Sequence, residues 1–85
     1  MKLPRTKPTL GKNLIGPQLR RLRLEMEPKV TLEDLSGRLA ARGLYLDRTA
    51  LSRIENQQRA VFDFEVPVLA SALKVPLEKL YRSTT

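Results

Sequence analysis

Two short amphipathic segments with similar start signals lie in tandem between residues 31 and 56, and they constrain the fold more than any other feature of this chain. In the first segment, Thr31 is followed three residues later by Asp34, which is the spacing of a capping box at a helix N-terminus. Val30 before the cap and Leu35 behind it have the spacing of a hydrophobic staple. The pattern therefore predicts a helix that begins directly after the threonine.

The second segment repeats part of this signal. Asp47 is the expected N-cap, with Leu46 and Leu51 as the staple. Between the two helices, Gly43 is the expected left-handed residue that ends the first one, with Leu44 as its apolar contact. Two helices joined by one tight corner, with basic and polar residues on the outer face of the second, form a helix-turn-helix. DNA binding is therefore the leading hypothesis.

Helical spacing of apolar residues continues on both sides of this pair, and no stretch alternates as a β-strand would. The expected helices span about 17–26, 32–42 and 48–56, then from an Asp63 cap to about Lys74, and finally from Val75–Pro76 over Leu77, Leu80 and Tyr81. Pro17 suits the first turn of its helix, and Pro28 lies beyond that helix's end. The predicted fold class is all-α, with five short helices.

The predicted core is aliphatic, because the chain has only two Phe, two Tyr and no Trp. The residues expected to face it are Leu19, Leu22, Met26, Leu32 or Leu35, Leu39, Leu51, Ile54, Val66, Leu69, Ala70 and Leu73. We expect Phe64 rather than Phe62 in the core, and Tyr45 and Tyr81 in the core or at its rim. Leu77, Leu80 and Tyr81 could either close the core or form a dimer surface.

The net charge of +7 is concentrated at the N-terminal end. Residues 1–24 carry seven basic and no acidic residues, while residues 25–85 carry nine of each. Because residues 1–16 are rich in Pro and Gly and have no apolar period, we expect a flexible basic arm there and one folded domain over 17–85. The arm's basic residues are Lys2, Arg5, Lys7 and Lys12. A basic arm favours a polyanionic partner, with a merely solubilising tail as the alternative.

Composition excludes several other classes. Cysteine and histidine are both absent, so the chain offers no disulfide, thiol nucleophile, zinc finger or histidine base. The neighbouring carboxylates at 33–34 and 63–65 fall in expected first helical turns, without a catalytic partner. We therefore expect no enzyme activity, metal, cofactor or small-molecule ligand. With neither a long apolar run nor a signal peptide, we expect a cytoplasmic protein that joins the nucleoid when bound.

Four sequence pieces, in this order and spacing, resemble one known family. They are L-R-R-L-R at 19–23, T-L-E-D-L-S at 31–36, L-S-R-I-E-N at 51–56 and V-L-A-S-A-L-K-V-P-L-E-K-L-Y at 68–81. Over about three quarters of its length the chain is similar to the phage-repressor-like (XRE or Cro-type) helix-turn-helix proteins. The resemblance implies a lambda-repressor-like domain, and a transcription regulator that reads the major groove of double-stranded DNA with residues 48–56.

The resemblance also implies roles for individual residues. Facing the base edges would be Arg48, Thr49, Ser52 and Arg53. The loop of Asn56, Gln57, Gln58 and Arg59 would contact the DNA backbone. Arg23 and Glu55 would form an internal ion pair that ties the first helix to the end of the third. On the first helix, Arg20 and Arg21 are further candidates for phosphate contact.

The chain departs from the family pattern at three places. Most members have one residue between the last core leucine of the second helix and the next apolar residue, whereas this chain has six, residues 40–45. We therefore expect an extra turn on the second helix and a longer corner. Leu32 stands where many members have a glutamine that touches the DNA backbone. Gln57 replaces the usual glycine after Asn56, which predicts either a different turn or a left-handed residue at some energetic cost.

Two other functions fit the same sequence. One is a protein-interaction module, such as an antitoxin or the partner of an anti-regulator, with the helix-turn-helix as a scaffold. The other is non-specific DNA or RNA binding driven by the basic arm, against which the third helix argues, because A-form RNA hides its major groove from a helix. A palindromic DNA site would require a homodimer, and the sequence does not decide the oligomeric state.

Overall fold

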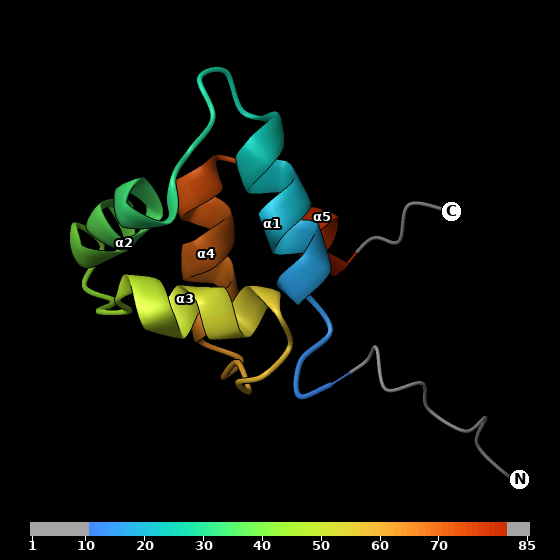
Figure 1. Cartoon of the computed structure of the whole chain (residues 1–85). Helices are drawn as coiled ribbons and strands as arrows, with labels where there is room; N and C mark the ends of the chain where they lie inside the picture. The colour runs from blue at the N-terminus through green and yellow to red at the C-terminus, as the bar shows by residue number, and fades with distance from the viewer. Residues whose placement is uncertain (1–10, 82–85) are drawn as a thin grey trace, which may run out of the picture.

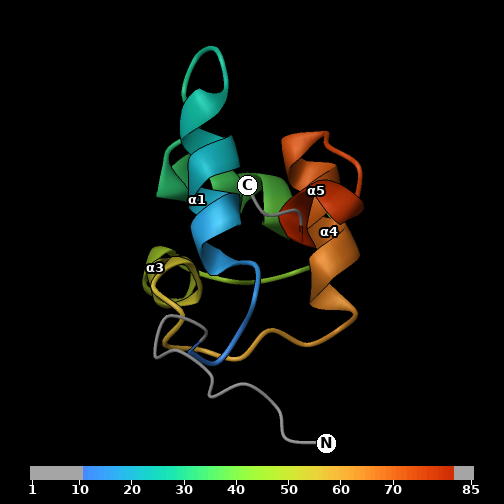
Figure 2. The same cartoon turned by 90° about the vertical axis from the view of Figure 1, so that its right-hand side faces the viewer.

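The computed structural model describes residues 11–81, and within that span it contains helices and no strand (Figure 1). The helices are α1 (Gly16–Glu25), α2 (Leu32–Ala40), α3 (Arg48–Glu55), α4 (Glu65–Leu73) and α5 (Glu78–Tyr81). The prediction of an all-α fold with five short helices is thus confirmed. α3 crosses one end of the molecule and is seen end-on below α1 in Figure 2. It packs against α1 and α2, while α4 packs against α2 and α5.

The start of α2 has the local structure that its sequence predicts. The backbone N–H of Asp34 donates to the Thr31 hydroxyl at 2.9 Å, and the backbone N–H of Thr31 donates to the Asp34 carboxylate at 3.1 Å. This bond from the Thr31 backbone, with smaller contributions from the Thr31 side chain and Arg38, holds the pKa of Asp34 below its usual value. Val30 and Leu35 are both buried, as a staple requires.

Three helices end in the same way, with a left-handed residue just beyond the helix. These residues are Gly43 at φ +85°, Gln57 at φ +61° and Lys74 at φ +59°. In each case the next N–H donates to the carbonyl five residues earlier: Leu44 to Leu39, Gln58 to Arg53 and Val75 to Ala70. Only after α2 is the left-handed residue a glycine, so the ends of α3 and α4 accept a strained backbone of about 1–2 kcal/mol each. Of the two alternatives expected for the turn after Asn56, the structure has the left-handed residue, at Gln57.

The core is aliphatic, as predicted, and the aromatic residues lie outside it. Fully or nearly buried are Ile15, Leu19, Leu22, Val30, Leu35, Leu39, Leu46, Leu51, Ile54, Val66, Leu69, Ala70, Ala72, Leu73 and Leu80. The placement of Phe64 in the core is wrong, since it is 63% exposed and stacks on the exposed Phe62 ring with centroids 5.7 Å apart. Tyr45 is also exposed. On α5, Leu80 closes the core, whereas Leu77 and Tyr81 remain on the surface.

The predicted Asp63 cap of α4 is also wrong. The residue at the N-cap position is Phe64, and no side chain caps the helix there. Glu65 takes over the polar role instead, because its carboxylate turns inward and accepts the backbone N–H of Phe62 at 2.9 Å. Glu65 is therefore buried with hydrogen-bond partners, whereas Asp63 is exposed to solvent.

The boundary between arm and domain also needs correction. Residues 11–16, expected to be part of a flexible arm, pack onto the folded domain, and Ile15 is 2% exposed in the core. Gly16 begins α1 so close to α3 that a Cβ atom there would collide with the carbonyl oxygen of Ile54. An apolar side chain and a close backbone contact therefore hold this segment. The rest of the predicted arm, residues 1–10, lies outside the described residues.

Candidate nucleic-acid interface

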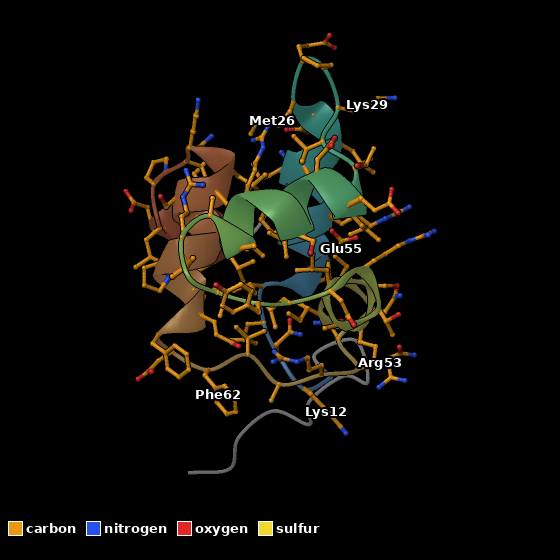
Figure 3. The ribbon with its side chains drawn as sticks, turned by 90° about the vertical axis from the view of Figure 1, so that its left-hand side faces the viewer. Lys12, Met26, Lys29, Arg53, Glu55 and Phe62 are labelled. Carbon is orange, nitrogen blue, oxygen red and sulfur yellow. The ribbon has the colours of Figure 1, made fainter. Side chains whose placement is uncertain are left out.

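α3 has one buried and one outward face. Leu51 and Ile54 are fully buried, while Arg48, Thr49 and Arg53 are exposed. Ser52, also expected to face bases, is half-buried. Figure 3 shows the Arg53 side chain extending away from the helix bundle. The helix therefore presents two guanidinium groups and a hydroxyl to whatever lies against this end of the molecule.

Both ends of α3 are held in place. At the start, the Asp47 carboxylate accepts the backbone N–H of Ala50 at 2.8 Å. At the other end, the Arg23 guanidinium donates two bonds to the Glu55 carboxylate, at 2.7 and 2.9 Å, and a third to the Val30 carbonyl oxygen at 2.8 Å. The structure thus brings Arg23 and Glu55 together as an internal ion pair with both side chains more than 90% buried.

A second buried glutamate holds the turn after α3. The Arg59 guanidinium donates to the two Glu65 carboxylate oxygens at 3.1 and 3.2 Å, and its carbon lies 6.0 Å from the Phe62 ring centroid. Arg59, expected to contact the DNA backbone, is therefore bound within the protein. Sequence reasoning missed Glu65, although an acid three residues after Phe62 has the spacing to reach back to that residue's N–H.

The other backbone candidates divide into inward and outward residues. Gln57 is half-buried, and its side-chain amide donates to the Asn13 carbonyl oxygen at 2.9 Å. Asn56 and Gln58 are exposed. On α1, Arg20 shares a shallow hollow with Asn56, which brings the first helix and the end of α3 to one surface.

Arg21 lies beside this hollow as well, but its guanidinium donates to the Glu25 carboxylate at 3.0 Å. Both side chains are well exposed, so the pair is screened and weak. Arg20 lies 4.0 Å from the Glu55 carboxylate and is mostly exposed. Both arginines therefore remain accessible to an anion.

On the other side of α3, Lys12 lines a hollow together with Thr49, Arg53 and Gln58. Figure 3 shows Lys12 and Arg53 at the same end of the molecule. Of the four residues assigned to the arm, Lys12 alone belongs to the described part of the chain, and Lys2, Arg5 and Lys7 lie outside it. The lysine therefore adds a positive charge to the same end of the molecule as the outward face of α3.

The N-terminus of α2 has the opposite charge. Glu33 and Asp34 occupy its first turn, and Leu32 lies half-buried against the core. Glu33 also lines a shallow hollow with Arg48 at the start of α3. A phosphate would be repelled at this helix end, so the positive part of the surface lies toward Lys12, Arg53 and α1.

No protein-family model, curated protein or solved structure matches this chain. Among residues 11–81, no group of three or more acidic, His or Cys side chains could hold a metal ion. The same part of the chain has no helix that is long and apolar enough to cross a membrane. The functional argument therefore rests on the geometry and charge of the surface around α3.

Proposed function

We propose that this protein is a sequence-specific regulator of transcription that binds double-stranded DNA through a lambda-repressor-like helix-turn-helix, with α3 in the major groove. The observation that carries the proposal is the state of α3: its apolar face is buried, its polar face is exposed, and both of its ends are fixed by Asp47 and Glu55. A pre-organised helix loses little conformational entropy when it binds.

The side chains on the outward face suit base recognition. Arg48 and Arg53 each carry a guanidinium that can donate two parallel hydrogen bonds to guanine O6 and N7. The methyl group of Thr49 fits against a thymine methyl, and the Ser52 hydroxyl can donate or accept. These four residues would supply selectivity.

Phosphate contacts would come from residues on either side of α3. Lys12 lies on one side, and Arg20, Arg21 and Asn56 lie on the other. Gln58 is exposed in the turn between them. Arg59 and Gln57 would shape this turn, because their side chains already bond within the protein. Contacts from separate elements are the pattern expected of a protein that sits across a groove.

The first test is selection of bound duplexes from a random library at about 150 mM salt, a concentration at which non-specific phosphate binding is weak. A recovered motif would support base-specific recognition. Two inverted copies about one helical turn apart would indicate a dimer, and a single copy a monomer. Binding at low salt without any recovered motif would contradict the proposal and leave non-specific binding.

Replacement of Arg53 tests the role of α3 directly. Arg53→Ala should weaken binding to the selected site by roughly 1–3 kcal/mol and binding to random DNA far less. Lys79→Ala, which removes an exposed positive charge from α5, is the matched control and should change neither affinity. Equal losses on both DNAs after Arg53→Ala would mean that the arginine touches only phosphate.

The salt dependence tests the electrostatic part. If about six phosphates are neutralised, log K should fall against log[salt] with a slope near −5. A slope near −1 would contradict the set of phosphate contacts given above, whatever the site preference.

One observation favours a protein partner instead. The stacked rings of Phe62 and Phe64 are more than half exposed, and aromatic side chains on a surface are typical of protein interfaces. The double variant Phe62→Ser, Phe64→Ser separates the two functions. If the chain is a DNA-binding regulator, the variant should recover the same DNA motif. The interaction module would be favoured if neither the wild type nor the double variant selects a DNA motif and the double variant alone fails to bind a protein partner.

A further inference from the structure

Asn13 uses its side-chain amide to join three separate parts of the backbone. Its Nδ2 donates to the Ile54 carbonyl oxygen in α3 and to the Arg59 carbonyl oxygen beyond the turn, both at 2.9 Å. Its Oδ1 accepts the backbone N–H of Gly16 at 2.7 Å, at the start of α1. The half-buried asparagine therefore ties the N-terminal segment to the end of α3 and to the turn that follows it.

Two reciprocal bonds complete this connection. The backbone N–H of Lys12 donates to the Gln57 carbonyl oxygen at 3.0 Å, and the Gln57 side-chain amide donates to the Asn13 carbonyl oxygen at 2.9 Å. We call the five hydrogen bonds that join Lys12, Asn13, Gly16 and the 54–59 segment the N-terminal clasp. The clasp holds the backbone N–H of Lys12 and the carbonyl group of Asn13, so the direction in which the Lys12 side chain leaves the backbone is fixed.

The clasp determines where the positive charge of Lys12 lies. The lysine side chain is exposed and lines one hollow with Thr49, Arg53 and Gln58. Asp47 and Arg59 also line this hollow, but the Asp47 carboxylate caps α3 and the Arg59 guanidinium is bound to Glu65. Lys12 and Arg53 are thus the basic residues of this hollow that are exposed to solvent.

We propose that Asn13 is a positioning residue for DNA binding: it holds Lys12 beside α3, where the ammonium contacts a DNA phosphate next to the base-reading face. This inference rests on the proposed function, and it assigns a role to a residue that touches no DNA itself. Without the clasp, Lys12 belongs to a mobile chain and must lose conformational entropy to make the same contact.

The decisive variant is Asn13→Ser. A serine hydroxyl can still accept the Gly16 N–H at the start of α1, as it does in other turns of this kind, but it cannot donate to both carbonyls. The substitution therefore removes the two clasp bonds that the Asn13 side chain donates to the Ile54 and Arg59 carbonyl oxygens, and it keeps the helix start. Lys12→Ala removes the charge itself, and Lys79→Ala is the control for loss of a positive charge elsewhere. All three are compared on the selected duplex over a range of salt concentrations, after urea unfolding has shown that each full-length variant is folded.

The salt slope is the readout that a merely structural role would not change. Lys12→Ala should reduce the magnitude of the slope by about 1, the effect of losing one phosphate contact. Asn13→Ser should also reduce the magnitude of the slope, by more than half of the reduction that Lys12→Ala causes. The double variant should match Lys12→Ala alone, because Asn13 acts through Lys12.

Each failure has its own signature. If Asn13→Ser lowers affinity with the wild-type slope, or adds its full effect to that of Lys12→Ala, its role is structural and the inference is wrong. An unchanged slope for Lys12→Ala would overturn the inference as well, while the proposed function would stand on the recovered motif and on Arg53→Ala. A wild-type chain that selects no duplex would remove both proposals.

Discussion

Glu55 and Glu65 are both buried and both bound by an arginine at the two oxygens of the carboxylate, yet they hold different kinds of structure. Glu55 joins segments 32 residues apart, and its partner Arg23 has a side chain only 8% exposed. Glu65 joins a turn to the helix that follows, six residues from Arg59, whose side chain is 27% exposed. The first pair is a tertiary connection sealed from water, whereas the second shapes a turn and keeps an arginine near solvent.

The largest effect should follow from breaking the sealed pair. Arg23→Met should lower the free energy of unfolding by about 3–5 kcal/mol, because it leaves Glu55 as a buried carboxylate without its main partner. That is a large part of the total stability of a small domain, about 5–15 kcal/mol. Urea denaturation of the variant and the wild type at neutral pH measures the difference.

A double substitution serves as the control. Arg23→Met combined with Glu55→Leu should recover most of the lost stability, because apolar side chains of similar volume can replace a buried pair at little cost. If Arg23→Met alone costs less than about 1 kcal/mol, in the range of an exposed pair, the site is open to water and the contrast with Glu65 disappears.

Glu65→Gln should have a smaller effect, about 1–2 kcal/mol. Glutamine can still accept the Phe62 N–H, and the released Arg59 can turn to water, so no charge is left buried. Thermal and urea unfolding measure the loss. The control is Asp63→Asn, at the exposed acid that does not cap α4, and it should stay within about 0.5 kcal/mol. A greater cost for Asp63→Asn than for Glu65→Gln would contradict the assignment of the polar role to Glu65.

Lys74 and Gln57 are both left-handed residues at helix ends, but only the Gln57 side chain also makes a hydrogen bond to a distant segment, at Asn13. Lys74 is exposed at φ +59°, so Lys74→Gly should stabilise the protein by about 0.5–1 kcal/mol, the relief of strain less the added entropy of the unfolded chain. Gln57→Gly relieves similar strain but also removes the bond to Asn13, so its net gain should be near zero. Equal gains in urea denaturation would show that this tertiary bond contributes little.

The smallest effect concerns Asp34, a carboxylate bound locally and exposed. Its pKa is lowered in the folded protein, first by the bond from the Thr31 backbone N–H. The stabilisation is therefore fully present above the unfolded value near 3.8 and is lost as the pH falls through the lower folded pKa. Urea denaturation between about pH 5 and pH 2.5 should show a slightly steeper loss of stability for wild type than for Asp34→Asn.

Glu33→Gln is the control for this pH dependence, because it removes a charge from the same first turn and leaves the capping box intact. Its pH profile should keep the wild-type steepness below about pH 4. If Asp34→Asn retains that steepness as well, the Asp34 carboxylate does not contribute through the capping box.

Much of the fold could be predicted because its signals are short. The capping box at Thr31, the Asp47 cap and the left-handed Gly43 each involve residues at most a few positions apart, and the structure has all three. The aliphatic core followed from helical spacing. The candidate site was predicted less well: Arg48, Thr49 and Arg53 do lie outward, whereas Arg59 and Gln57, expected on the DNA backbone, bond within the protein.

The residues that sequence reasoning misplaced depend on neighbours distant in the chain, or on which of several similar side chains the fold buries. Asn13 was placed in a flexible arm, because its partners are carbonyl groups more than 40 residues away. Phe64 was placed in the core, but aliphatic side chains already fill the space between α1, α2 and α4. Asp63 was expected to cap α4, but Glu65 is the acid that the fold buries, beside Arg59 and the Phe62 N–H.

The sequence by itself determined roughly where the helices lie, which of their faces are apolar, and that the core is aliphatic. Those properties depend on backbone hydrogen bonds and side-chain spacing within a turn or two of helix. Only the tertiary structure decided which charged residues face solvent and which pair internally, and that Lys12 lies beside α3. Such choices depend on the removal of water from groups that the fold brings together, and desolvation is a property of three-dimensional surroundings.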